Sequence, residues 1–296
     1  MKVINLKNNF HKKEKKIVEN FLRILIYSAA ILTCLVLISI MFYIFLKGLS
    51  KVNFNFLSNI YSESSDIKGI LPMIINTLYV VIITLIISIP LGIGSAIYLT
   101  QYTKKNFFNK IIVFTSSVLS GVPSIILGLF GYSIFCIKFK LGISIISGCL
   151  TMFLCVLPII IKTSEEALRD VPNEYREAAI ALGIKNHKII FEIILPAAVP
   201  GMLVSVSLCI GRILGESAAL IYTLGMAYGM PKGIFSHIFS SGRTLTLHLY
   251  QISKQANTED SFDIAFATAS VLLIFTLILN LVTDFFLRGF FKNTKR

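Results

Sequence analysis

Six long apolar runs are the feature that most constrains how this chain can fold. They cover residues 21–46, 71–99, 111–137, 141–162, 193–224 and 264–287. A helix needs about 20 mostly apolar residues to cross the hydrocarbon core of a bilayer, and each run is long enough. A soluble fold could not hide this much apolar surface, since charged residues make up only 15% of the 296 and the mean hydropathy is +0.79. The runs predict an all-α integral membrane protein with six spanning helices.

The six runs are interpreted as one transmembrane domain at about residues 21–290. We expect residues 1–20 to form a basic N-terminal segment and residues 291–296 a short tail. The first run is too long for the core of a signal peptide and follows a long charged head, so it is interpreted as a retained span. The head is interpreted as a topology anchor beside anionic lipid, and a surface-binding helix is the alternative.

The positions of Lys and Arg predict the orientation in the membrane. With six spans, the head, the loops after the second and fourth spans, and the tail fall on one side, and they hold most of the 28 basic residues. Cytoplasmic loops carry such an excess, so both termini are predicted to be cytoplasmic. The net charge of +13 does not indicate a nucleic-acid binder, because the basic residues lie at the edges of apolar runs rather than on one folded face.

The cytoplasmic segment between the fourth and fifth spans has the pattern of a helical hairpin, at about 163–192. Pro172 suits the first turn of a helix, and Gly183 suits the left-handed position after its end. A second helix is expected from about Asn186 into the membrane. One face is apolar and the opposite face charged: Tyr175, Ala178, Ala179 and Leu182, against Glu174, Arg176 and Glu177. Such a small-residue face fits a groove on another protein, or equally packs on the chain's own bundle.

The residues of this hairpin carry a resemblance to a known family. Glu177-Ala178-Ala179, three residues, Gly183, nine residues, Ile193, one residue and Leu195-Pro196 resemble the EAA signature of bacterial ABC-importer membrane subunits. The resemblance implies a six-helix, type I (MetI-like) permease fold whose hairpin docks into a separate ATPase. It makes Glu177, Ala178, Ala179 and Gly183 the candidates for ATPase coupling.

The sequence contains no G-x-x-x-x-G-K-[ST] phosphate loop. We therefore expect a non-catalytic transport subunit that binds no cofactor itself, with ATP and Mg used by partner ATPase subunits.

One pair of charges, Arg212 and Glu216, lies deep in apolar sequence, within the fifth span. A charged side chain there is costly unless it is paired or faces water. At i, i+4 the two side chains share a helix face and can neutralise each other, while Gly211 and Gly215 leave room beside them. The pair is either a structural ion pair or a substrate station.

As a substrate station, this pair favours an oxyanion that carries a proton. The planar fork of Arg matches phosphate or carboxylate oxygens. A neighbouring carboxylate repels a fully deprotonated oxyanion such as sulfate, but it accepts a hydrogen bond from phosphate near neutral pH. The residue types thus suggest phosphate over sulfate.

A second resemblance covers the chain from about residue 70 to its C-terminus. The stretches GVPSIILGLFG (121–131), LPIIIKTSEEALRDVP (157–172), GRILGESAAL (211–220) and TLTLHLYQIS (244–253) resemble the PstA family of phosphate-importer permeases. The Gly-Arg-x-x-Gly-Glu-[Ser/Thr]-Ala block is its most specific element, and it implies a substrate pathway at Arg212, Glu216 and Ser217. This chain departs from the family at Ala219, where Pro is usual, and at Gln101, where an acidic residue is common.

The resemblance implies a permease of the bacterial cell membrane that imports inorganic phosphate. It also implies a PstC-like second permease, two PstB-like ATPase subunits and a PstS-like extracytoplasmic phosphate-binding protein. The alternative is a permease for phosphonate, sulfate or molybdate. An ion-coupled secondary carrier is less favoured, because we find no convincing internal repeat. No deep His cluster, nucleophile pair or metal-ligand spacing indicates an enzyme.

The segment 225–262 is more polar than the runs on either side of it and is expected outside the membrane. Apolar residues recur near its middle, at Leu245, Leu247, Leu249 and Ile252. We interpret this segment as a cap packed on the bundle, and a docking surface for an external binding protein is the alternative.

Overall fold

The computed structural model describes residues 2–61, 68–102, 107–230, 233–255 and 259–294, and these residues form helices and connecting loops without a β-strand. The all-α prediction is confirmed. The α-helices are α1 (Lys2–Gly48), α2 (Phe54–Ser58), α3 (Leu71–Ile97), α4 (Phe107–Gly121), α5 (Ser124–Gly131), α6 (Ile145–Arg169), α7 (Asn173–Ala181), α8 (Asn186–Lys188), α9 (Leu195–Gly215), α10 (Leu220–Thr223), α11 (Ile234–Ile238), α12 (Leu245–Gln255) and α13 (Glu259–Thr294). The remaining elements are a 3₁₀-helix, η1 (Leu49–Lys51), and three π-helical segments, η2 (Tyr98–Tyr102), η3 (Tyr132–Lys138) and η4 (Ile189–Ile194).

Five helices in the described part of the chain are long and apolar enough to cross a membrane. They contain α1, α3 with η2, α6, α8 with η4 and α9, and α13. The predicted third span is different. Residues Lys110–Gly121 and Ser124–Lys138 pass the same test only as a pair, bent by 106°.

The span predicted over 111–137 is therefore not one continuous helix. Pro123 explains the break, because its ring removes a backbone donor and disfavours a helical conformation for Val122 before it. Pro123 instead has an extended backbone (φ −56°, ψ 135°) and precedes the first turn of α5. The chain has up to six spans if the bent pair is one of them.

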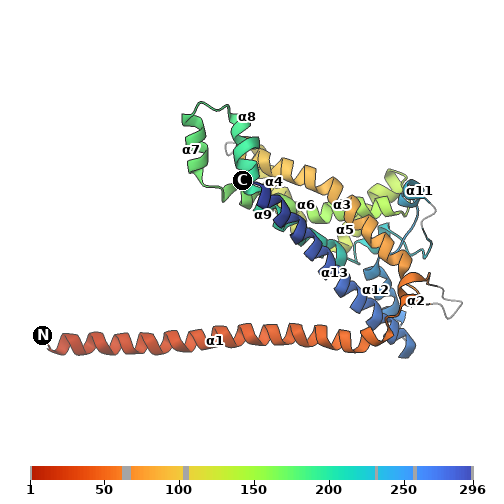
Figure 1. Ribbon diagram of the computed structural model, residues 1–296, viewed down its shortest axis with the longest axis horizontal. Helices are drawn as coiled ribbons and strands as arrows, with labels where there is room; N and C mark the ends of the chain where they lie inside the picture. The colour runs from red at the N-terminus through yellow and green to blue at the C-terminus, as the bar shows by residue number, and fades with distance from the viewer. Residues whose placement is uncertain (1, 62–67, 103–106, 231–232, 256–258, 295–296) are drawn as a thin grey trace.

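The predicted basic segment and the first span form one continuous helix, α1. Figure 1 shows α1 extending well beyond the rest of the molecule. It meets α13 near its C-terminal end, where the rings of Tyr43 and Phe266 lie 5.7 Å apart and Ser270 Oγ donates to the Ile44 carbonyl (3.1 Å). From Phe21 to Ile40 its apolar side chains are exposed in this single chain.

The core lies where α3, α6 and α9 pack together, with α5 and α10 against them. Its fully buried residues include Val80, Met152, Cys209 and Leu220. Two further apolar clusters lie at the two ends of this bundle.

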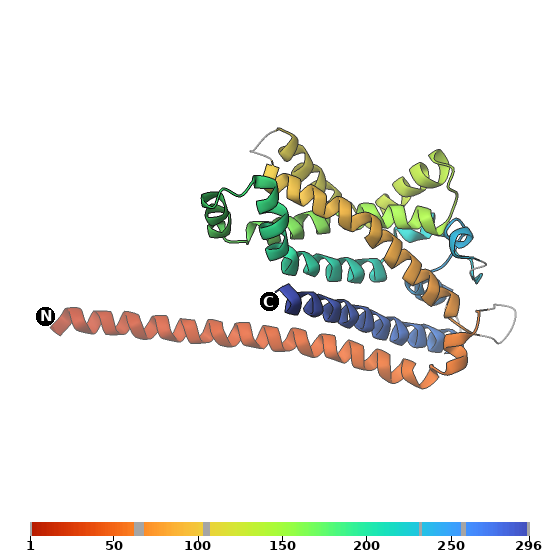
Figure 2. The same ribbon diagram turned by 45° about the horizontal axis from the view of Figure 1, so that its top comes forward.

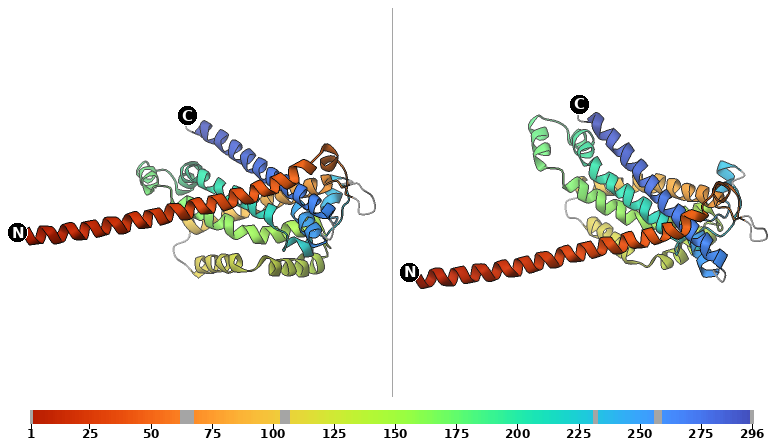
Figure 3. Two further views of the ribbon diagram at one scale, coloured as in Figure 1. Left: turned by 90° about the horizontal axis from the view of Figure 1, so that it is seen from below. Right: turned by 60° about the horizontal axis from the view of Figure 1, so that its bottom comes forward.

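The two ends of the bundle are distinct. The hairpin end carries α7 and α8, and α1 begins and α13 ends toward this side (Figures 1 and 3). The far end carries α2, α11 and α12 (Figures 1 and 2). This arrangement agrees with the predicted even number of crossings, in which the termini and the hairpin share one side.

The interpretation of the far-end segment as a packed cap is confirmed for α12. Leu245, Ile252 and Leu249 pack in a cluster with α13 and the start of α3, and Leu247 is fully buried in the main core.

Candidate functional site

The hairpin has the predicted shape, with shifted bounds. It begins later than predicted, because α6 continues to Arg169, and α7 starts at Asn173, with Pro172 one position before the helix. Gly183 ends α7 with the predicted left-handed backbone (φ +74°), and its N–H donates to the Ile180 carbonyl (2.9 Å). A residue with a Cβ is strained at this φ, so glycine is favoured there. The second arm then runs from Asn186 through η4 into α9, as predicted.

The predicted apolar stripe of α7 is divided between two environments. Ala179 is buried against the bundle, in a cluster with Leu168, Ile189 and other apolar residues. Tyr175 and Leu182 are instead 55% and 79% exposed, and Ala178 is exposed as well. Within the apolar stripe, α7 therefore contacts the bundle through Ala179 and leaves the rest of its apolar surface free. Glu177, as expected, is exposed.

The charge pair predicted in the fifth span is present. Arg212 Nη2 lies 3.0 Å from Glu216 Oε2, and the two side chains differ sharply in burial, at 47% and 6% exposed. A Cβ built on Gly211 or on Gly215 meets nothing within 4 Å, so both positions are open. Because one partner is buried and the other half-exposed, the guanidinium keeps donors available on its open side.

The local structure around this pair differs from the prediction. A helix continuing to residue 224 was wrong: α9 ends at Gly215, and Glu216 has an extended backbone (φ −89°, ψ 122°). The pair is therefore not on one helical face. The Glu216 side chain also accepts a hydrogen bond from the Ala219 N–H (3.3 Å), which closes a turn before α10. This hydrogen bond stabilises Glu216 outside the helix, which explains why the helix ends before it.

The turn after Glu216 is held closely by α5. A Cβ built on Gly128 would lie 2.8 Å from the Ala219 carbonyl oxygen and 2.9 Å from its Cα. Only glycine allows α5 to approach the turn at this distance. Ser217 is half-buried in the same turn, and its carbonyl accepts from the N–H groups of Leu220 and Ile221.

The structure keeps the two groups of predicted residues apart. The coupling candidates lie at the hairpin end, before α9 begins, whereas Arg212 is in its last turn. At 1.5 Å per residue, roughly 26 Å of helix separates Leu195 from Arg212. Any effect of the hairpin on the charge pair must therefore pass along the spans.

A buried polar cluster at the far end was not predicted. Arg243 and His248, assigned to an outer loop from the sequence, are 4% and 0% exposed. Arg243 donates to the Tyr228 hydroxyl (2.8 Å) and the Met226 carbonyl (2.9 Å). Burial lowers the pKa of His248 to about 3, and the charge of Arg243 adds to this. The burial of His248 could have been predicted from its spacing, since it lies between Leu245 and Ile252 on the apolar face of α12.

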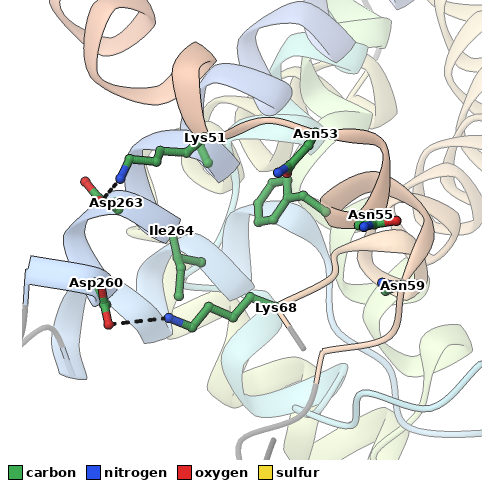
Figure 4. Close-up of a pocket in the computed structure, with 10 residues that line it drawn as sticks. Lys51, Asn53, Asn55, Asn59, Lys68, Asp260, Asp263 and Ile264 are labelled. Carbon is green, nitrogen blue, oxygen red and sulfur yellow. Dashed lines mark ion pairs between the residues drawn. The ribbon is translucent and has the colours of Figure 1, made fainter. Parts of the chain in front are cut away.

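The far end also has a polar cleft of about 440 Å³ between α2 and the start of α13 (Figure 4). Lys51 and Lys68 point into it, each toward an aspartate of α13: Lys51 to Asp263 (2.6 Å) and Lys68 to Asp260 (3.7 Å). Two cations balanced by two carboxylates give no net attraction for an anion. Arg212 therefore remains the better candidate for binding an oxyanion.

The residues from 88 to 296 match the family model described as "Binding-protein-dependent transport system inner membrane component". The "Probable ABC transporter permease protein YqgI" of Bacillus subtilis is 31% identical over 257 residues, which are 83% of this chain and 87% of that protein. The "Phosphate transport system permease protein PstA" of Haemophilus influenzae is 30% identical over 260 residues, 86% of this chain and 87% of that protein. A PstA homolog of Mycoplasma pneumoniae is 31% identical over 88% of this chain, but the match spans only 40% of its own length.

Two solved structures are similar in fold. The bacterial alginate ABC transporter, in complex with an alginate pentasaccharide-bound periplasmic protein, has a TM-score of 0.65 at 15% identity, over 91% of this chain and 94% of that chain. The inward-facing MetNI methionine ABC transporter has a TM-score of 0.60 at 17% identity, over 78% of this chain and 99% of that chain. At these identities the likeness concerns the fold alone.

Proposed function

The chain belongs to the family of binding-protein-dependent transport system inner membrane components and is a PstA-like permease subunit of an ABC importer, and we propose that it imports inorganic phosphate. Members of this family are not catalytic themselves. ATP hydrolysis belongs to partner subunits, in line with the absence of a phosphate loop from this sequence.

The observation that carries the phosphate proposal is the geometry of Arg212 and Glu216. The guanidinium is half-exposed, while the carboxylate 3.0 Å away is almost fully buried. An oxyanion that reaches the open side of Arg212 meets N–H donors in a planar fork. The same anion lies close to a negative charge that the protein holds in place through the Ala219 N–H.

The nearby carboxylate supports selection for a protonated oxyanion. Phosphate near neutral pH carries at least one O–H, which can donate a hydrogen bond to Glu216. Sulfate carries two negative charges and no proton, so it meets only repulsion from the carboxylate. Two relatives named above are called phosphate permeases, which favours the same substrate.

The exposed part of α7 supports a role in coupling. Tyr175, Ala178 and Leu182 form an apolar surface beside Glu177, and this surface fits a groove on a separate ATPase. In this proposal Glu177, Ala178, Ala179 and Gly183 form the coupling element. Two PstB-like ATPases, a PstC-like second permease and a PstS-like binding protein complete the importer, and the hairpin end and both termini face the cytoplasm. ATP and Mg are bound by the ATPase subunits.

A second candidate substrate is another oxyanion, namely phosphonate, sulfate or molybdate. Arg212 alone would serve any of these. Glu216 separates phosphate from sulfate and molybdate, because an anion without a proton gains nothing from a buried carboxylate beside the arginine, whereas phosphonate can carry a proton as phosphate does.

The test is labelled-phosphate uptake in cells that depend on this subunit, with wild type compared with Arg212→Ala at matched membrane expression and with unlabelled sulfate as competitor. We expect uptake to need the subunit, to ignore sulfate and to collapse in the variant. Uptake that never depends on the subunit would remove phosphate as the substrate. Normal transport by Arg212→Ala would make the pair a structural ion pair.

A further inference from the structure

Arg176 of α7 connects the hairpin to the second predicted span. Its Nη1 donates to Gln101 Oε1 (3.2 Å), and its Nη2 donates to Asn186 Oδ1 (3.2 Å). Gln101 lies in η2, which continues α3, and Asn186 begins α8. One half-buried guanidinium thus joins both arms of the hairpin to the end of a different span. The sequence pattern placed Arg176 on the charged face of α7 and predicted no contact with another span.

Both partners of Arg176 lie in or directly before π-helical segments. Gln101 is inside η2 (Tyr98–Tyr102), and Asn186 stands three residues before η4 (Ile189–Ile194). A π-helical turn holds more residues than an α-helical turn, is rare in proteins and is frequently found at functional sites. Such a segment can shift its register without breaking the helix. The link therefore ends inside one π-helical segment and three residues before another.

The hairpin is packed on one side of this link and open on the other. Ala179 seats α7 against Leu168 and Ile189 in an apolar cluster. On the other side, a cavity of about 400 Å³ lies between η2 and the start of α7, lined by Gln101, Arg176 and neighbouring residues. The apolar contact of Ala179 can act as a pivot for α7, and the cavity leaves space into which α7 can move. Both residues of the polar link line this cavity.

Arg169 lines the same cavity and provides a comparison. It pairs with Glu165 one turn earlier in α6 (2.7 and 3.1 Å), so its charge is satisfied within its own helix. Arg176 donates instead to two neutral side-chain oxygens from two other elements. A guanidinium in this arrangement connects elements rather than neutralising a local charge.

We propose that the Arg176–Gln101 link transmits movement of the hairpin to the second span through η2. When the partner ATPases move α7 about the buried contact of Ala179, the bond from Arg176 to Gln101 moves η2 and the end of α3 with it. The bond from Arg176 to Asn186 makes the second arm of the hairpin move together with α7. Arg176 and Gln101 are then positioning residues for transport, and they do not contact the transported anion. The inference rests on the ABC-importer role of the chain and is independent of which anion it carries.

The test uses the complete importer in proteoliposomes, with ATP hydrolysis and phosphate uptake measured in the same preparation. Gln101→Leu removes the acceptor at similar volume, whereas Gln101→Glu keeps an acceptor and makes the link an ion pair. Arg169→Gln is the matched control, since it removes an arginine from the same cavity without touching the link. We expect Gln101→Leu to lower uptake per ATP by about threefold or more, and Gln101→Glu and Arg169→Gln to stay within about twofold of wild type.

A distance measurement makes the test independent of the substrate. Spin labels are placed at Gly94→Cys, which has open space around it in α3, and at Glu174→Cys, which is exposed on α7. Cys34→Ser provides the background, because Cys34 is the exposed cysteine and Cys136, Cys149, Cys155 and Cys209 are buried. With the link intact, the distance between the labels should change by no more than about 2 Å on ATP binding. With Gln101→Leu it should change by more.

The proposal is wrong if Gln101→Leu keeps the wild-type uptake per ATP hydrolysed and the wild-type change in label distance on ATP binding. A parallel loss of protein, ATP hydrolysis and uptake that Gln101→Glu does not restore also overturns it, because the link would then only stabilise the fold. If the wild-type importer carries no phosphate, the substrate proposal fails, and the distances still decide whether the link exists.

Discussion

Replacing Glu216 by Gln isolates the role of the buried carboxylate in anion selection. The substitution keeps the side-chain length and an oxygen that can accept from the Ala219 N–H, so the turn after α9 should persist. It removes the negative charge 3.0 Å from Arg212. The guanidinium is already 47% exposed, so losing its partner leaves no fully buried, unpaired cation.

The expected magnitude follows from the position of the pair. Two unit charges 4 Å apart interact by about 1 kcal/mol in water and by about 4 kcal/mol near a protein surface. With one partner 6% and the other 47% exposed, the site lies between these limits. Because a dianion carries two charges, removing the repulsion should improve its binding by about 1.4 kcal/mol or more, which is tenfold. The binding of protonated phosphate should change less, because phosphate loses only a charged acceptor and can still donate a hydrogen bond to the amide oxygen of the new Gln side chain.

The assay is inhibition of labelled-phosphate uptake by sulfate in wild type, Glu216→Gln and Glu216→Asp, at matched expression. The concentration of sulfate that halves uptake should fall about tenfold or more in Glu216→Gln. Glu216→Asp keeps the charge and is the control, so its resistance to sulfate should persist.

Unchanged sulfate resistance in Glu216→Gln, with phosphate uptake preserved, would refute the reasoning. The carboxylate would then orient Arg212 without selecting among anions. A loss of all uptake with normal protein levels would show instead that Arg212 needs its ion-pair partner to bind any anion.

Three other predictions concern separate parts of the molecule. Leu182→Glu puts a charge on the exposed apolar surface of α7, so it should weaken co-purification of the ATPase subunits about tenfold or more without lowering the Tm of the isolated permease. Gly128→Ala places a methyl group 2.8 Å from the Ala219 carbonyl oxygen, and it should destabilise the chain by about 1–3 kcal/mol in thermal unfolding and reduce uptake. His248 has a folded-state pKa of about 3, below its ordinary 6.5, so the unfolded chain binds the extra proton and stability should fall as the pH drops below about 6.5. The free energy of unfolding should fall by about 2 kcal/mol at pH 5. His248→Leu should flatten the pH dependence of the Tm. The replacement breaks no hydrogen bond of the ring, because both ring nitrogens lack partners among the described residues.

The membrane class and the hairpin could be predicted from the sequence because both depend on local patterns. The length of each apolar run is set by the thickness of the bilayer, and five of the six predicted runs correspond to spanning helices. The ends of α7 also follow local rules, as Gly183 shows with its positive φ. The pairing of Arg212 with Glu216 was predicted from their separation of four residues, although Glu216 lies outside the helical face on which the prediction relied.

The breaks in the helices were harder to predict. Pro123 marks the bend between α4 and α5, but its angle of 106° depends on how both pieces pack against other helices. Glu216 leaves α9 because its carboxylate binds the Ala219 N–H and because α5 holds the following turn through Gly128. Hydropathy falls at Arg212 and Glu216, but apolar residues lie on both sides of them, so the pattern does not show that α9 ends at Gly215.

By itself, the sequence determined that this chain spans a membrane and has a hairpin with the EAA pattern at one end. The tertiary structure decided which side of that hairpin is free: Ala179 faces the bundle, and Tyr175 and Leu182 do not. It also decided that Arg243 is buried and that Arg176 reaches Gln101, 75 residues earlier in the chain. The physical reason is the distance along the chain between the residues that decide each feature. Spans, caps and i, i+4 pairs are decided by neighbouring residues, whereas burial and links between helices exist only once distant segments pack together.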